Sequence, residues 1–131
     1  FAPVGKLTGL TQIARDNILM RWQEDMAELA LYPNVYTKMS GLFMPVLGHQ
    51  FHKQGRLASR QEVYDLASPL INHALKCFGA QRVMFASNFP MDRVSSSLVN
   101  IIDAFSDAVV AHDPNALEQV FHHTAKQFYA L

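Results

Sequence analysis

The stretch RVMFASNFPMD, residues 82–92, carries the clearest structural signal in the chain. Its first residues are apolar on both faces of an expected strand, which is typical of parallel strands that helices cover on each side. The stretch then turns polar, and Asn88 follows the strand where an enzyme built on parallel strands would be expected to carry a carboxylate. The fold and the chemistry of this chain therefore both depend on what surrounds this strand.

Outside this strand, helical and strand patterns alternate along the chain. Apolar residues recur at three- and four-residue spacing in four segments, which predicts four helices. The predicted helices are 18–31 with a stripe of Leu19, Trp22, Met26 and Leu29, 59–79 up to Gly79, 98–109, and one that starts with Asp113 as N-cap and Pro114 at N1. A second short strand begins at Val35 in VYTKMSGL, and a long loop, Phe43 to Ala58, follows it.

The second predicted helix has a recognisable start and a doubtful middle. Ser59 and Glu62 have the spacing of a capping box. Ser68 and Pro69 leave open a break that would divide this helix into two pieces.

Composition limits the classes of function. The chain has 131 residues, half of them hydrophobic, which fits one globular domain. Eleven basic residues balance eleven acidic ones without a block of like charge, so neither a nucleic-acid surface nor a membrane patch is expected. A small molecule is the expected partner.

The same residues indicate a soluble, cytoplasmic protein. No apolar run approaches the roughly 18 residues of a membrane span, and the start FAPVGK lacks a charged leader followed by an apolar segment. Cys77 is the single cysteine, which excludes an internal disulfide, and its place in an apolar helical pattern favours a buried structural thiol.

Two strands are too few for a stable parallel sheet. A pair of strands with several amphipathic helices leaves both sheet edges and much helical surface unburied. We therefore expect these residues to be part of a larger sheet whose other strands lie outside this sequence.

Three segments carry a resemblance to a known family: NVYTKMSGLFMPVLGHQFH, FGAQRVMFASNFPMD and VFHHTAKQFYAL. Together they resemble the C-terminal part of the amidohydrolase-related, or amidohydrolase 2, family of TIM-barrel hydrolases, over essentially the whole chain. The resemblance implies an α/β fold that comprises about the last two βα units and the closing helix of a (β/α)8 barrel. VYTKMSG would be the seventh strand, RVMFASN the eighth, and FAPVG the loop after the sixth.

A barrel of this kind takes about 250 residues, so roughly half would be missing. The resemblance implies that the missing half holds the paired-histidine motif of strand one and, where one is present, a divalent metal such as zinc or manganese. No residue of this chain is assigned as a metal ligand. Residues 1–131 would be the C-terminal portion of a single barrel domain, with the missing half as its partner, and a homo-oligomer stays open.

Asn88 departs from the family pattern. Many members have Ser-Asp-Trp-Pro or Ser-Asp-Phe-Pro at SNFP, residues 87–90, and that Asp serves as general base toward water. An amide cannot accept a proton at neutral pH, but its carbonyl can orient a water and its NH2 group can donate to a substrate oxygen. We interpret Asn88 as an active-site residue; the alternative is a turn residue that caps its own backbone.

Five further residues are candidates for the site. Lys38 and Ser40 lie two apart near the end of a strand and should share a face, where they would bind substrate unless the lysine only reaches solvent. His49 and His52 lie on the long loop and are candidates for substrate contact or proton transfer, although exposed loop histidines are common. Asp92 would bind substrate or supply the missing carboxylate, unless it pairs with Arg93 or a backbone amide.

The function that this resemblance implies is hydrolysis of a small polar substrate, such as a lactone or a related carboxylic ester or amide. Water would be activated by a base from the missing half or by His49 or His52, while Asn88, Lys38 and Ser40 would position the substrate. A non-oxidative decarboxylase and a catalytically degenerate binding domain are the alternatives. His122 and His123, on the last helix, are interpreted as structural or exposed.

Overall fold

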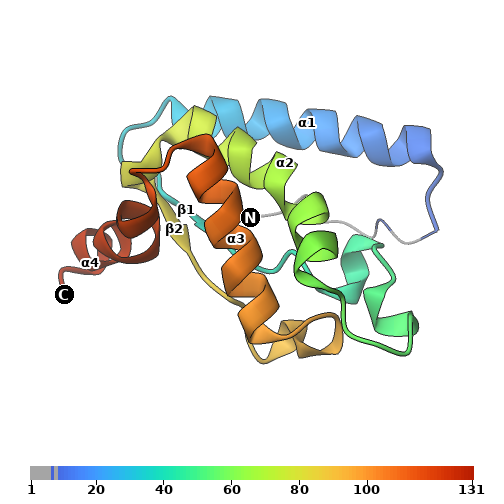
Figure 1. Ribbon diagram of the computed structural model, residues 1–131. Coiled ribbons are helices and arrows are strands. Elements are labelled where there is room, and N and C mark those ends of the chain that lie inside the picture. The colour runs from blue at the N-terminus through green and yellow to red at the C-terminus, as the bar shows by residue number, and fades with distance from the viewer. Residues whose placement is uncertain (1–6, 8) are drawn as a thin grey trace.

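The computed structural model describes Leu7 and residues 9–131, so the predicted loop FAPVG lies outside the described residues. Helix and strand alternate as expected (Figure 1): α1 Gln12–Ala30, β1 Thr37–Met39, α2 Arg60–Phe78, β2 Val83–Phe85, α3 Leu98–His112 and α4 Thr124–Tyr129. Short 3-10 turns lie at Pro45–Leu47, Phe51–Lys53, Ala80–Arg82 and Met91–Val94, and a π-helical turn at Gln119–His123 precedes α4.

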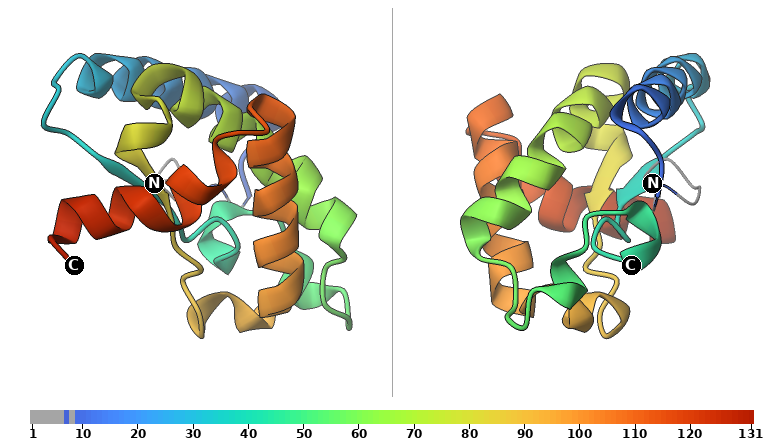
Figure 2. Two further views of the ribbon diagram at one scale, coloured as in Figure 1. Left: turned by 60° about the vertical axis from the view of Figure 1, so that its left-hand side comes forward. Right: turned by 90° about the vertical axis from the view of Figure 1, so that its right-hand side faces the viewer.

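The two strands pair in parallel, with Thr37 opposite Val83 and Met39 opposite Phe85. Helix α2 connects them and packs beside α3 over one face of the strands (Figures 1 and 2). Met39 and Val83 are fully buried in the hydrophobic core on this side. Phe85 packs its ring against Phe105 of α3 at 5.4 Å between centroids. Within the described residues, this is one βαβ unit flanked by α1, α3 and α4.

Helix α1 is longer than its apolar stripe predicted. It begins at Gln12, where the Thr11 hydroxyl accepts a hydrogen bond from the backbone of Ala14, six residues before the predicted start. Of the predicted stripe, Trp22 and Met26 are buried, but Leu29 is 47% exposed. Within the described residues α1 packs chiefly against α2, so only part of this apolar stripe is covered.

Helix α2 has the predicted start and no break. The Ser59 hydroxyl accepts from the backbone of Glu62, and the Glu62 carboxylate accepts from the backbone of Ser59, which confirms the capping box. The helix continues through Pro69, so a break at this proline is wrong. Pro69 and Asp65, whose carbonyl loses its helical donor, are both exposed, so water can satisfy that carbonyl.

Arg82 lies at the start of β2, in a 3-10 turn instead of in the strand as predicted. Its guanidinium donates to the carbonyl of Phe78 at the end of α2, and to Tyr32 and Ala30 at the end of α1. One side chain therefore binds carbonyls at the ends of two helices, and the Tyr32 carbonyl also accepts from the backbone of Val35.

The last helical segment begins later than predicted. The Asp113 carboxylate accepts from the backbone of Asn115, as an N-cap would, but residues 114–116 form a turn and helical geometry starts at Leu117. Along this segment Val120 is buried, whereas Phe128 is 48% exposed and packs on Tyr36.

Both strands point toward the same edge of the molecule, at the bottom of Figure 1. Two loops, residues 40–59 after β1 and 86–97 after β2, meet at this edge, as the right-hand view of Figure 2 also shows. Since catalytic groups of parallel βα units lie at the carboxyl ends of the strands, these loops form the candidate site.

Candidate functional site

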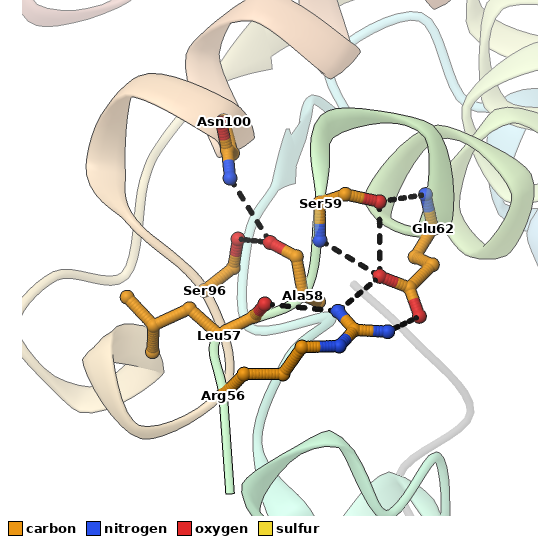
Figure 3. Close-up of polar contacts among 7 residues, drawn as sticks. All are labelled: Arg56, Leu57, Ala58, Ser59, Glu62, Ser96 and Asn100. Atoms are coloured by element: carbon orange, nitrogen blue, oxygen red, sulfur yellow. Dashed lines mark hydrogen bonds and ion pairs between the residues drawn. The ribbon is translucent and has the colours of Figure 1, made fainter. Parts of the chain in front are cut away.

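The two loops are joined to each other at Ala58. Its backbone N–H donates to the carbonyl of Ser95 at 2.8 Å, and its carbonyl accepts from the Ser96 hydroxyl at 2.8 Å and from the Asn100 amide at 3.0 Å. Figure 3 shows how Ser96 and Asn100 approach the Ala58 carbonyl from the second loop and the first turn of α3. The end of the first loop is thereby fixed against the second.

An ion pair holds the chain just before α2. Arg56 binds both carboxylate oxygens of Glu62 at 2.8 Å and also donates to the carbonyl of Leu57 (Figure 3). The Arg56 guanidinium, with the hydrogen bonds from Ser59, lowers the pKa of Glu62 to about 2. This corner of the loop is therefore ordered by contacts among neighbouring residues, none of which is a candidate for the site.

Asn88 lies three residues beyond β2 and its side chain meets Asp92. The Asn88 Nδ2 atom donates to Oδ1 of Asp92 at 2.8 Å. The side chain thus bonds to Asp92. A simple turn residue would instead bond to its own backbone. The backbone of Asn88 has φ 56°, a left-handed conformation that asparagine tolerates better than most residues.

The end of β1 approaches Asn88 closely. A Cβ atom at Gly41 would lie 3.8 Å from the Asn88 Nδ2 atom and 3.2 Å from Cε of Met44. Gly41 has φ +74°, so the backbone conformation, together with the close approach of Met44, favours glycine here. The amide therefore lies between the ends of the two strands.

Asp92 is buried, with only 1% of its surface exposed. Among the described residues, the structure shows no ion pair between Asp92 and Arg93, so that part of the expectation is wrong; the other part, a backbone amide, fits the N–H of Phe43. Residues 91–94 form a 3-10 turn, and the carboxyl at its start accepts from the Asn88 amide. Burial raises the pKa of Asp92, while the Asn88 amide and the backbone amide of Phe43 act in the opposite direction. Oδ2 of Asp92 has no hydrogen-bond partner within the described part of the chain.

Phe43 connects the two loops at a second point. The Ser95 hydroxyl donates to the carbonyl of Phe43 at 2.6 Å, and both residues are buried. Sequence reasoning missed Gly41, Phe43 and Ser95. Of these three, only Gly41 had a signal in the sequence, as a glycine just after a strand. Phe43 and Ser95 had none, because they contact each other across about fifty residues of chain.

His49 and His52 lie in different surroundings. The Nδ1 atom of His49 accepts from the backbone of Phe51 at 3.1 Å, and its ring stacks on that of Phe51 at 4.6 Å. Its Nε2 atom is buried with no partner among the described residues. Burial lowers the pKa of His49, with a smaller contribution in the same direction from the charge of His52. His52 is exposed.

Within the described residues, neither Lys38 nor Ser40 makes a hydrogen bond or ion pair with Asn88. Lys38 is exposed and its Nζ atom lies 3.3 Å from the hydroxyl of Tyr129, at the end of α4. Ser40 is half-buried at the end of β1. On the π-helical turn, His122 and His123 are exposed as expected, and His123 lies 3.4 Å from the carboxylate of Glu118.

No metal centre is assembled by Leu7 and residues 9–131. These residues contain no group of three or more His, Cys, Asp or Glu side chains that could hold a metal ion. The half-buried Cys77 thiol has its pKa raised by burial, so it is not an activated nucleophile. Among the same residues, no helix is both long and apolar enough to cross a membrane.

A hollow of about 240 Å³ opens between α1, α2 and the loop after β1, away from the candidate residues. Most of its lining side chains are leucines, and two are polar residues of α1. The lining residues are Leu7, Gln12, Arg15, Leu19, Leu42, Leu47, Leu66, Pro69 and Leu70.

Comparison with known proteins relates this chain to amidohydrolases. Residues 8–131 match the family described as Amidohydrolase. The chain is 33% identical over 108 residues to the uncharacterized protein y4mH of Sinorhizobium fredii, covering 82% of this chain and 32% of that protein. It is 28% identical over 120 residues to an L-fucono-1,5-lactonase of Burkholderia multivorans, covering 88% of this chain and 37% of that enzyme.

Solved structures agree. Two crystal structures of an amidohydrolase from Burkholderia multivorans, one with bound HEPES and one with bound zinc, each superpose with a TM-score of 0.73 at 26% identity. Each comparison covers 88% of this chain, but only 38% and 39% of the solved chains. The chain thus spans about a third of the length of these relatives and solved chains, from 32% to 39%.

Proposed function

The chain belongs to the amidohydrolase family and forms part of a (β/α)8 barrel, and on this premise we propose that the complete protein is a hydrolase of small polar lactones or related carboxylic esters or amides. The lactone is favoured because one similar protein is an L-fucono-1,5-lactonase. In this proposal, residues 1–131 are the C-terminal portion of the barrel domain, and the free edges of β1 and β2 pair with strands outside this chain.

The observation that carries the proposal is the position of Asn88. Its amide lies at the carboxyl end of β2, where barrel enzymes place their catalytic groups, and a buried carboxyl fixes one of its two N–H groups. The second N–H and the carbonyl oxygen make no hydrogen bond among the described residues. Both are therefore available to a substrate.

In the reaction, the free N–H of Asn88 would donate to the carbonyl oxygen of the substrate. That oxygen gains negative charge as water attacks, so the hydrogen bond strengthens in the transition state. Asn88 cannot take the proton from the water, because an amide is not a base at neutral pH.

Of the two loop histidines, only His52 keeps its ring nitrogens free of hydrogen bonds to the described residues. The Nδ1 lone pair of His49 is used by the backbone of Phe51, so in the neutral ring the proton is on Nε2. His49 is consequently a possible donor and not a base. We propose that the base is His52 or a residue of the barrel outside this chain.

A divalent metal such as zinc or manganese belongs to the proposal only as a group held outside this chain. A solved relative binds zinc, but the described residues offer no set of ligands for such an ion, and no step above depends on one. Lys38 and Ser40 remain proposed substrate contacts, with Lys38 reaching the site only if its contact with Tyr129 opens.

The test uses the full-length protein and a panel of sugar-acid 1,5-lactones, aliphatic lactones, carboxylic esters and amides. A pH indicator follows the acid released from lactones and esters, and an amine assay follows hydrolysis of the amides, which releases no net acid at neutral pH. We expect lactone hydrolysis, and a loss of about tenfold to a thousandfold in kcat/KM for Asn88→Ala. Asn17→Ala, which removes an exposed amide on α1, serves as the matched control and should leave kcat/KM unchanged.

Failure to hydrolyse any member of the panel would contradict the proposal. Release of CO2 from carboxylic acids would instead support a decarboxylase, and tight binding without turnover would support a degenerate binding domain. Full activity in both His49→Ala and His52→Ala would remove the proposed role of the loop in proton transfer.

A further inference from the structure

We infer that Asp92 is a positioning residue, whose carboxyl group fixes the side-chain amide of Asn88 at the mouth of the barrel without touching the substrate. This inference rests on the proposed function of Asn88. It differs from the expectation that Asp92 binds substrate directly.

The burial of Asp92 argues against direct substrate contact. Its side chain and backbone together are 1% exposed, although this chain lacks much of the barrel that would bury it further. Oδ1 faces the Asn88 amide at 2.8 Å. A ligand at the mouth would therefore meet Asn88 before it could meet the carboxyl group.

Asp92 is itself held in place by both loops. Its backbone carbonyl accepts from the N–H groups of Ser95 at 3.0 Å and Ser96 at 3.2 Å, which closes the turn after β2. The Ser95 hydroxyl then binds Phe43 in the loop after β1. The carboxyl group is thus attached to a rigid part of the structure, whereas Asn88 is half-buried at its edge.

The chemistry of the pair determines the orientation of the amide. The two ends of an asparagine side chain have the same shape, but an ionised carboxylate only accepts hydrogen bonds, so it selects the NH2 end. The Asn88 carbonyl must then point to the other side. An amide at position 92 would accept either orientation and would not make this choice.

The first experiment observes the amide directly, whether or not the protein is active. In the full-length protein, ¹H–¹⁵N spectra identify the Asn88 NH2 signals as the pair that Asn88→Ala removes. We expect one of the two protons to be shifted and slow to exchange in the parent. In Asp92→Ala both protons should move toward the values of an exposed asparagine.

Asp113→Ala is the matched control, because Asp113 is an exposed aspartate that also accepts a hydrogen bond from a nearby asparagine amide. It should leave the Asn88 signals unchanged. If Asp92→Ala does not fold, Asp92→Asn keeps the size of the side chain and should still weaken the shift and the protection. Asn88 signals that stay the same in a folded Asp92 variant would overturn the inference.

The second experiment is a double-mutant cycle in kcat/KM. Asp92→Ala should lose about tenfold to a hundredfold, which is usual for the partner that orients a site residue, and Asp92→Asn should lose less. Asn88→Ala combined with Asp92→Ala should be no slower than the slower single variant, because Asp92 acts only through Asn88.

The outcomes separate this inference from the proposed function. Losses that multiply in the double variant would mean that Asp92 acts independently of Asn88, and the positioning role would be wrong. A protein in which Asn88→Ala costs no activity would instead refute the proposed function of Asn88, while the spectra would still decide whether Asp92 orients it.

Discussion

Replacing Asn88 by aspartate would place a second carboxyl group against the buried carboxyl of Asp92. The parent pair is an N–H donor and an acceptor 2.8 Å apart, and the substitution turns the donor into another acceptor. Two carboxylates at this separation cannot both stay ionised, so the folded protein must take up a proton or move the groups apart.

The size of the effect follows from either alternative. Two unit charges about 4 Å apart repel by about 4 kcal/mol at an effective dielectric constant of about 20. In the other alternative, one carboxyl group stays protonated in the folded protein. Because the unfolded pKa of such a group is about 3.9, protonation costs about 4 kcal/mol at pH 7 and about 1.5 kcal/mol at pH 5. We therefore expect Asn88→Asp to lower the free energy of unfolding by up to about 4 kcal/mol at pH 7 and by much less at pH 5.

The sign of the pH dependence is fixed by linkage. The pKa of the pair is raised in the folded state above its unfolded value, so stability is fully present below the unfolded pKa and is lost as the pH rises. Urea unfolding of the full-length protein at pH 5, 6 and 7 measures this loss. The matched control is the exchange Asn88→Asp with Asp92→Asn, which keeps one carboxylate and one amide and should recover most of the stability.

Kinetics separate stability from function in the same variants. Both Asn88→Asp and the exchanged pair should have lower kcat/KM, because a carboxylate faces the substrate oxygen where the amide donated before. The reasoning would be refuted if Asn88→Asp were as stable as the parent at pH 7. It would also be refuted if that variant were faster, with a new acidic limb at the ordinary pKa of a carboxyl group, since the site would then be a weakened Asp-based one.

Three further predictions concern two residues at the site and one at the opposite end of β2. Gly41→Ala should cost about 1 kcal/mol in the free energy of unfolding, because φ is +74° and a Cβ would lie 3.2 Å from Cε of Met44; unchanged urea unfolding would contradict this. Burial lowers the pKa of His49, so its contribution to stability is present above the unfolded pKa of about 6.5 and is lost as the pH falls. His49→Phe should therefore flatten the fall in the free energy of unfolding, measured with urea, between pH 7.5 and 5, by less than about 1.4 kcal/mol per pH unit; an unchanged fall would contradict this. Arg82→Met should lower the free energy of unfolding by about 2–3 kcal/mol and leave kcat/KM unchanged, because Arg82 lies at the opposite end of β2 from the loops; a drop in activity in the folded variant would show otherwise.

Local signals predicted the parts of the fold that depend on neighbours in sequence. The capping box of Ser59 and Glu62 is confirmed because its hydrogen bonds join residues three apart. The apolar strand and the polar turn after it predicted that Asn88 lies at the carboxyl end of β2. The same strand has no polar face, which indicated that it is covered on both sides. The alternation of helix and strand was sufficient to indicate a parallel arrangement and a sheet that needs further strands.

Features that depend on burial or on distant segments were decided only by the tertiary structure. Pro69 left the integrity of α2 open, because whether a helix tolerates a proline depends on what surrounds the freed carbonyl. Lys38 could not be assigned a partner, since Tyr129 lies 91 residues further along the chain. The pairing of Asp92 with Asn88 depends on the turn of residues 91–94, which Ser95 holds against Phe43. Sequence thus determined where the amide of Asn88 lies, and packing between segments far apart in the chain determined which way it faces.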